Sequence, residues 1–110
     1  MGKSHDKKVK LYSKPENLTP LLNENIVEVL HEKKFKEVFN KCYSELTPDL
    51  FAFPDHDEYV WIGEIKGFNC VKNIEKAHRQ IERYLHEMDR YDIPAKGFII
   101  VGDYTELIRI

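Results

Sequence analysis

Hydrophobic positions in the first third of the chain recur at the spacing of a helix. Thr19 suits a helix N-cap, and Pro20 suits the first helical position because its fixed φ matches the helix. The apolar residues that follow share one helical face: Leu22, Ile26, Val29 and Leu30. This pattern predicts a helix over residues 20–33.

Three later segments have the composition of strands. Residues 35–43 alternate loosely between apolar and polar side chains, and residues 49–53 form a short apolar run. Residues 59–66 mix β-branched and aromatic side chains, which is the clearest strand pattern in the chain. Between the last two segments, residues 54–58 combine proline with acidic side chains and predict a hairpin-type turn.

The second half of the chain combines a long amphipathic helix with a strongly apolar run. Residues 72–90 place five apolar side chains on one helical stripe: Ile74, Ala77, Ile81, Leu85 and Met88. Residues 96–101 have the pattern of a central strand buried on both faces, and a turn follows at 102–103. Residues 106–110 fit either a last helix or an edge strand. The predicted fold class is α/β, in the order αβββαβ, with a central mixed β-sheet flanked by helices.

Charge is distributed unevenly along the chain. Its 110 residues are the length of one domain, and their formal net charge is −2. Residues 1–14 hold five lysines and one aspartate, which predicts a flexible basic arm. Residues 15–110 form the predicted folded domain and carry a balance of −6. Nucleic-acid-binding proteins usually have an excess of basic residues, so this charge argues mildly against such a partner.

The cysteines and the apolar runs indicate a compartment. Cys42 and Cys70 are too few for a disulfide framework and lack the spacing of a metal site. No apolar run approaches the roughly 20 residues that cross a bilayer, and the first residues lack the apolar core of a secretory signal. We therefore expect an intracellular, cytoplasmic protein with reduced thiols and no membrane partner.

Acidic and basic side chains meet the ends of two predicted strands. Asp49 opens the run at 49–53, and Glu64 and Lys66 close the run at 59–66. Side chains two positions apart on a strand project from the same face, so Glu64 and Lys66 lie together. If the two strands are neighbours, Asp49 joins them. Two carboxylates and one ammonium in a small space are suited to hold a divalent cation beside a phosphodiester.

Three motifs in order resemble the PD-(D/E)XK nuclease superfamily. They are Pro48-Asp49, Glu64-Ile65-Lys66, and Gln80 with Tyr84 on the following helix. The last pair is similar to the QxxxY motif of RecB-like nucleases. The resemblance covers about residues 20–102 and implies a restriction-endonuclease-like core.

The resemblance also implies a role for each motif residue. Asp49, Glu64 and the backbone carbonyl of Ile65 would bind Mg²⁺ or Mn²⁺, which prefer hard oxygen ligands. Lys66, beside two carboxylates, would hold the attacking water or the phosphate rather than act as a general base. Gln80 and Tyr84 share a helix face and would support these groups. The implied activity is hydrolysis of DNA phosphodiester bonds by metal-activated water attack; RNA cleavage would use the same residues.

The family pattern leaves further expectations. Many relatives place an acid on the first helix, where Glu24 and Glu28 compete in this chain, with Glu24 preferred because it is nearer the helix start. The four cysteines that bind an iron–sulfur cluster in some RecB-like enzymes are missing, so no cluster is expected. Small relatives act as dimers, and a chain this short is expected to form a homodimer.

Each motif also has a purely structural interpretation. A Glu-x-Lys at a strand end is usually a solvated ion pair, and Asp49 after a proline is often a turn residue. Trp61 and Phe68 flank the central motif, with core packing as the default and base stacking as the alternative. The competing hypothesis for the whole chain is a catalytically inactive nucleic-acid-binding or assembly module on the same fold, which the acidic composition favours.

Overall fold

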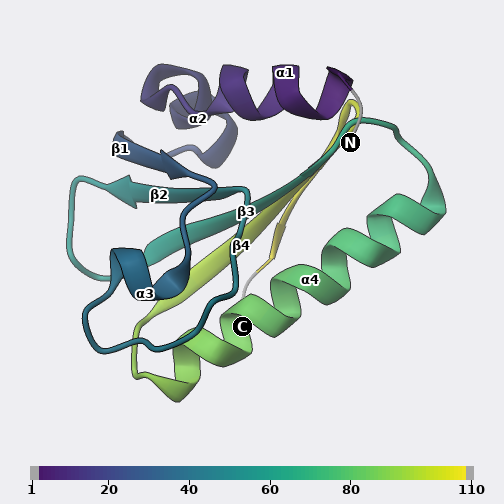
Figure 1. The fold of residues 1–110 in the computed structure, drawn as a ribbon. Coiled ribbons are helices and arrows are strands. Elements are labelled where there is room, and N and C mark those ends of the chain that lie inside the picture. Colours follow the sequence, from purple (N-terminus) through teal and green to yellow (C-terminus); the bar gives the residue numbers. More distant parts are fainter. Residues whose placement is uncertain (1–2, 109–110) are drawn as a thin grey trace.

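Five strands form one mixed β-sheet in the order β1-β2-β3-β4-β5 (Figure 1). A computed structural model describes residues 3–108 of the chain. Along the chain the elements are α1 (Lys3–Tyr12), α2 (Pro15–Leu22), β1 (Ile26–His31), α3 (Phe35–Val38), β2 (Leu50–Pro54), β3 (Val60–Lys66), α4 (Val71–Arg90), β4 (Ala95–Val101) and β5 (Tyr104–Ile108). Only β3 and β4 pair in parallel; every other neighbouring pair is antiparallel.

Helix α4 connects the parallel pair and fixes which strand ends meet. Because β3 and β4 are parallel, their carboxyl ends lie at one edge of the sheet, with Lys66 opposite Val101. The helix is 20 residues long, about 30 Å, and runs along the sheet from that edge to the other. It packs closely because Gly97 has no side chain: a Cβ there would lie 2.4 Å from Cγ2 of Ile81. This contact fixes the helix face that packs on β4.

Two hydrophobic clusters lie on opposite faces of the sheet. The face under α4 buries Phe35, Phe51, Ile62, Ile81, Met88 and Ile99, among others. The face under α1 and α2 buries Val9, Leu18, Leu22, Trp61, Phe98 and Ile100, among others. Figure 1 shows these two helix layers with the sheet between them. The α/β class and the mixed central sheet are thus confirmed.

The predicted helix over 20–33 is wrong. The helix ends at Leu22, where Asn23 adopts a left-handed φ of 56°, and the chain enters β1 at Ile26. The backbone N–H of Ile26 donates to the Thr19 hydroxyl at 3.1 Å, which closes this turn. Leu22, Ile26 and Val29 do pack into one cluster. The predicted apolar positions are therefore buried together, but Leu22 lies at the end of α2 and Ile26 and Val29 lie on β1.

Residues 35–43 are not the predicted strand. Phe35 begins the short helix α3, and residues 39–43 have no regular secondary structure. The aromatic side chains drive this outcome, because Phe35 and Phe39 both pack against Phe51, with ring centroids 5.5 and 5.7 Å away. Four residues apart, they reach the same ring from one helical turn. The first strand of the sheet is β1 instead.

Regular structure begins earlier than the predicted arm allowed. Most of residues 1–14 belong to α1, and residues 1–2 lie outside the described part. Val9 is buried at 3 % exposure and anchors this helix on the sheet. Val9 and Tyr12, which also packs on this cluster, are a weak signal among five lysines, and so the sequence pattern did not predict the helix.

The second half follows the prediction closely. Strands β2, β3 and β4, the turn after β2 and helix α4 match the predicted segments within one residue at each end. The ambiguous last segment is an edge strand, since β5 pairs with β4 from Tyr104 to Ile108. Residues 109–110 of the predicted segment lie outside the described residues.

Candidate functional site

Three of the predicted site residues converge where β2 begins and β3 ends. Asp49 immediately precedes β2, while Glu64 and Lys66 lie on β3, which pairs with β2. Glu64 and Lys66 share the face of Ile62, which belongs to the core under α4. The antiparallel pairing of β2 with β3 therefore places Asp49 beside the end of β3, as the spacing of the motifs predicted.

Asp49 is held by the strand it faces. Its Oδ2 accepts a hydrogen bond of 2.7 Å from the backbone N–H of Ile65. The same oxygen lies 3.4 Å from Nε2 of His5, and both side chains are about 15 % exposed. Its backbone carbonyl accepts from the N–H of Glu32 at 3.1 Å. Asp49 is thus a fixed carboxylate rather than a mobile turn residue.

Glu64 is the one charged residue that is buried among those the structure describes, at 5 % exposure. Its closest basic partner is Lys66, with Nζ 3.7 Å from Oε2, too long for a good hydrogen bond. Its other oxygen, Oε1, is buried with no hydrogen-bond partner. Burial, followed by the negative charge of Asp49, raises the pKa of Glu64 to about 7 despite Lys66. One oxygen of this buried carboxylate therefore lacks the donor that its burial requires.

Helix α4 brings Tyr84 to the same carboxylates and carries Gln80 one turn earlier. Tyr84 is 7 % exposed and packs on Phe35 with ring centroids 6.0 Å apart. Burial, then the negative charges of Glu64 and Asp49, raise the pKa of Tyr84. Gln80 precedes it by one helical turn, and its Oε1 is a second buried acceptor without a donor. Tyr84 is therefore partly a core residue, while Gln80 leaves an oxygen unused.

Glu24 does not join this group. It lies in the turn between α2 and β1, where it accepts hydrogen bonds from the Tyr59 hydroxyl and from Nε1 of Trp61, the latter at 3.1 Å. Tyr59 is five residues before Glu64, a separation of about 16 Å along a strand. The expectation that Glu24 binds the same metal ion as Asp49 and Glu64 is therefore corrected: its carboxylate is bound by Tyr59 and Trp61 instead. Glu28, the competing choice, is an exposed residue of β1.

The structure adds His5, which the sequence pattern missed. His5 lies on α1 and reaches Asp49 across 44 positions of sequence. It is four residues before the buried Val9, so both side chains share the inward face of the helix. That i, i+4 relation was the available signal. It stayed hidden because the segment was interpreted as an arm.

The donor set suits a hard divalent cation. Asp49 and Glu64 offer carboxylate oxygens, and Gln80 offers an amide oxygen that nothing else uses. Mg²⁺ needs only one or two protein carboxylates and completes its shell with water and phosphate oxygens. No cluster of three or more His, Cys, Asp and Glu in metal-holding geometry occurs within residues 3–108. The orphaned oxygen of Glu64 still fits a cation, because a buried acceptor without a donor is costly.

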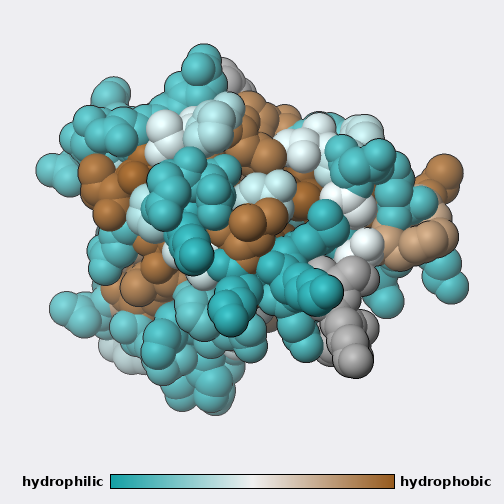
Figure 2. Space-filling view, turned by 90° about the horizontal axis from the view of Figure 1, so that it is seen from above, coloured by the Kyte–Doolittle hydropathy of each residue, from teal (hydrophilic) through white to brown (hydrophobic). Residues whose placement is uncertain are grey.

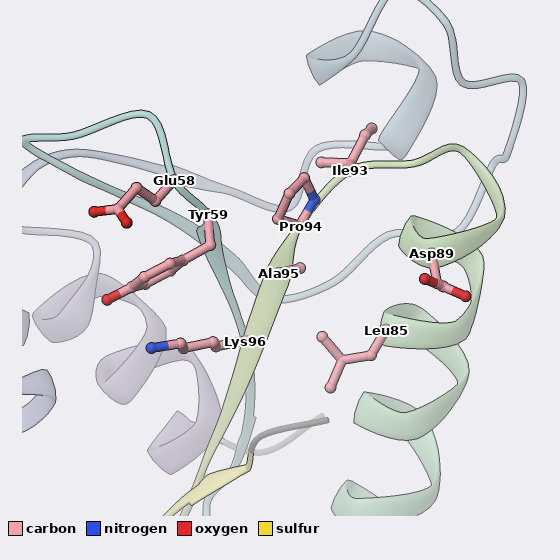
Figure 3. Close-up of a pocket in the computed structure, with 8 residues that line it drawn as sticks. All are labelled: Glu58, Tyr59, Leu85, Asp89, Ile93, Pro94, Ala95 and Lys96. Atoms are coloured by element: carbon pink, nitrogen blue, oxygen red, sulfur yellow. The ribbon is translucent and has the colours of Figure 1, made fainter.

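Among residues 3–108, hollows also lie outside this group of side chains. One, of about 370 Å³, lies between the start of β4 and the end of α4, beside Leu85, Asp89 and Ala95 (Figure 3). Figure 3 shows Tyr59 and Lys96 pointing away from α4, with Lys96 Nζ 3.8 Å from the Tyr59 ring centroid. This hollow is at the opposite end of β4 from the carboxylates. It therefore has no part in their chemistry.

The second hollow adjoins the carboxylates. It measures about 480 Å³ and lies between α1 and the end of β1. Its lining includes Asp6, next to His5, and Glu32, whose backbone N–H binds Asp49. Lys10 and Lys14 line it as well, so its charges are mixed. Its lining contains none of Asp49, Glu64 and Lys66 themselves.

Comparison of the chain with family models, with curated proteins and with solved structures gave no match. Within the described residues, no helix has the length and apolar character that crossing a membrane requires. Any function assigned to this chain therefore has to come from the contacts of its own residues.

Proposed function

We propose that the chain is a Mg²⁺- or Mn²⁺-dependent nuclease of the PD-(D/E)XK superfamily that hydrolyses DNA phosphodiester bonds. The observation that carries this proposal is the state of Glu64. Its carboxylate is buried beside a second carboxylate, has an oxygen without a donor, and has a raised pKa. Perturbed groups of this kind concentrate at functional sites, because a purely structural position would pair them.

The arrangement of elements supports the same proposal. Helices α1 and α2 precede three consecutive strands, α4 follows, and β4 returns parallel to β3. With the short α3 as an insertion, this order is compatible with the αβββαβ order expected of a restriction-endonuclease-like core. In that interpretation Asp49, at the start of β2, and Glu64 and Lys66, on β3, would be the superfamily motifs, with Gln80 and Tyr84 on the next helix.

Each residue has a role that its contacts allow. A bound divalent cation would lower the pKa of a water molecule and neutralise charge on the scissile phosphate. Asp49 and Glu64 would hold the cation, with the Ile65 carbonyl and Gln80 as further oxygen donors. The N–H of Ile65 keeps Asp49 oriented. Lys66, with 20 % of its side chain exposed, can reach an attacking water or a phosphate oxygen.

His5 extends this set of residues. Its Nε2 already lies beside Asp49 Oδ2, so the ring can orient that carboxylate or donate a nitrogen to the cation. Tyr84 would keep Glu64 in place from the core side. The site is therefore assembled from both helix layers and from the sheet edge between them.

A second function is favoured by the charge. The balance of −6 over residues 15–110 suits an assembly or binding module that keeps the fold without turnover. Such a module would not need Lys66 beside two carboxylates. A measurement of catalytic turnover therefore distinguishes the nuclease from the binding module.

Cleavage assays with matched variants test the proposal. Single-stranded, duplex and four-way-junction DNA and matched RNA are incubated with Mg²⁺ or Mn²⁺. We expect cleavage by the wild type and a loss of about 10²- to 10³-fold in Asp49→Asn and Lys66→Ala, the usual cost of removing a charge-stabilising group. Glu24→Gln, a carboxylate change outside the site, should cleave like the wild type. Absence of cleavage, or cleavage that both site variants retain, leaves the binding module.

Homodimerisation also stays a prediction. A single chain with a radius of gyration of 12.9 Å presents one set of catalytic side chains. Cutting both strands of a duplex would therefore take two copies. Sedimentation velocity of the full chain, with and without duplex DNA, measures this directly.

A further inference from the structure

Phe68 is exposed where a core position was the default expectation. Trp61, the other aromatic residue beside the motif, is fully buried as expected. Phe68 is 71 % exposed, and Val71, three residues later, is 69 % exposed. Figure 2 shows hydrophobic side chains protruding at the end of the molecule where α4 begins. Isolated surface hydrophobics are common, but Phe68 lies in the loop that leaves the candidate site and Val71 begins the helix after it.

This loop is fixed rather than loose. Nδ2 of Asn73 donates to the carbonyl of Phe68 at 2.8 Å, and Nδ2 of Asn69 donates to Asp103 at 2.8 Å. The N–H of Gly102 donates to the carbonyl of Lys66 at 2.8 Å. Gly102 also packs closely on the loop, since a Cβ there would lie 2.7 Å from that of Asn69. These hydrogen bonds hold the backbone that carries the Phe68 ring in place.

The loop begins directly after Lys66, the residue that would hold the phosphate in the proposed nuclease. Phe68 is two residues from Lys66, so their Cα atoms are at most about 7 Å apart. Residues 65–74 contain two lysines and no acid, in a chain with a net charge of −2. Asp103, an acid that contacts the loop, is engaged by Asn69. A phosphate chain can therefore pass here without meeting an unpaired carboxylate from the loop itself.

We propose that Phe68 is a stacking platform for an unpaired base of the substrate, which makes single-stranded nucleic acid the preferred substrate of this site. The inference rests on the proposed nuclease function and deepens it. An aromatic ring stacks on any base, but only an unpaired base exposes its π-face to a protein side chain. Val71 would extend the apolar surface under the same base. Duplex substrates would have to fray at this point before cleavage.

Binding of a fluorescent base analogue tests the platform. A single-stranded oligonucleotide with one 2-aminopurine and its matched duplex are titrated with the full chain in Mg²⁺, on a Lys66→Ala background that prevents hydrolysis. Phe68→Ala should weaken binding of the single strand by about 5- to 150-fold and abolish the stacking-dependent fluorescence quenching. Phe68→Tyr should retain both, because it keeps the ring, whereas Phe68→Leu should lose the quenching.

A matched control separates stacking from a general loss of aromatic surface. Tyr43 is 82 % exposed and lies near Tyr91, at the far end of α4. Tyr43→Ala should bind both oligonucleotides as the parent does. In cleavage assays with Lys66 restored, Phe68→Ala should lower the ratio of single-strand to duplex kcat/KM. Thermal melts should not change, since Phe68 is exposed.

The outcomes distinguish this inference from the proposed function. Cleavage that needs Asp49 and Lys66 but is indifferent to Phe68→Ala overturns the platform and leaves the nuclease. Stacking without cleavage supports the platform on an inactive binding module. If Phe68→Ala instead converts a dimer to a monomer in sedimentation velocity, a second copy of the chain covers the ring and the platform is overturned.

Discussion

Two carboxylates at opposite ends of β3 meet very different surroundings. Glu24, near the start of the strand, accepts hydrogen bonds from Tyr59 and Trp61. Burial alone would raise its pKa, but these hydrogen bonds and the charge of Lys96 lower it overall. Glu64, near the other end, is more deeply buried, has one unpaired oxygen and a pKa raised to about 7. Both carboxylate oxygens of Glu24 accept hydrogen bonds, whereas one oxygen of Glu64 has no donor.

The difference shows how a site can be told from a structural ion pair. Surface and core carboxylates normally collect donors, as Glu24 does. A carboxylate that stays buried beside another one, without enough donors, destabilises the fold. Such a cost is expected where a ligand supplies the missing charge. Glu64, which has one oxygen without a donor, meets that description, and this is why we propose the site there rather than at Glu24.

The largest effect on stability should come from neutralising Glu64 without metal. Because the pKa of Glu64 is raised in the folded protein, the unfolded chain loses its proton first, and stability falls as pH rises from about 4.5 to about 7. At 1.36 kcal/mol per pKa unit, the full cost is on the order of 3 kcal/mol. Glu64→Gln removes it, so the variant should be more stable than the wild type at pH 8 and similar at pH 4.5. Urea denaturation in EDTA measures both; a variant less stable at pH 8 would contradict the comparison.

Added metal should stabilise only the proteins in which Asp49 and Glu64 are both intact. Mn²⁺ at 100 times its Kd stabilises a protein by about 2.7 kcal/mol, a rise in Tm on the order of 10 °C for a chain of this size. The wild type and Glu24→Gln should show this rise, whereas Asp49→Asn and Glu64→Gln should show little of it. Differential scanning calorimetry with and without Mn²⁺ provides the values. Equal stabilisation of all four proteins would place the metal elsewhere.

The smallest effect concerns the satisfied end of the strand. Glu24→Ala removes the acceptor for Nε1 of Trp61, a fully buried residue, and leaves that donor unpaired. The loss should be about 1–2 kcal/mol of stability, with Mn²⁺ binding unchanged. Denaturation midpoints for Glu24→Ala and Glu24→Gln supply the test, because glutamine retains an acceptor. A loss of Mn²⁺ binding in Glu24→Ala would show that Glu24 also belongs to the metal site, which would contradict the comparison of Glu24 with Glu64.

The second half of the fold was predictable because its signals are local and strong. The apolar stripe on α4 follows the period of a helix over 20 residues. The apolar runs of β3 and β4 are each seven residues long, which is typical of buried strands. The first third failed because a helix and a strand divide one apparent helical pattern between them at Asn23. A left-handed asparagine has no strong signature in sequence, and each residue of β1 pairs with a β2 residue that lies far along the chain, from Ile26 with Pro54 to His31 with Leu50.

The candidate site divides in the same way. Asp49, Glu64, Lys66, Gln80 and Tyr84 follow from motif order and strand alternation, which are properties of local sequence. His5 and the exclusion of Glu24 do not, because each depends on which distant side chain meets it. Local periodicity determines which face of a strand or helix a residue occupies. Only the packing of distant elements decided that Glu24 has donors for both carboxylate oxygens and that one oxygen of Glu64 has none, because those donors lie far away in the sequence.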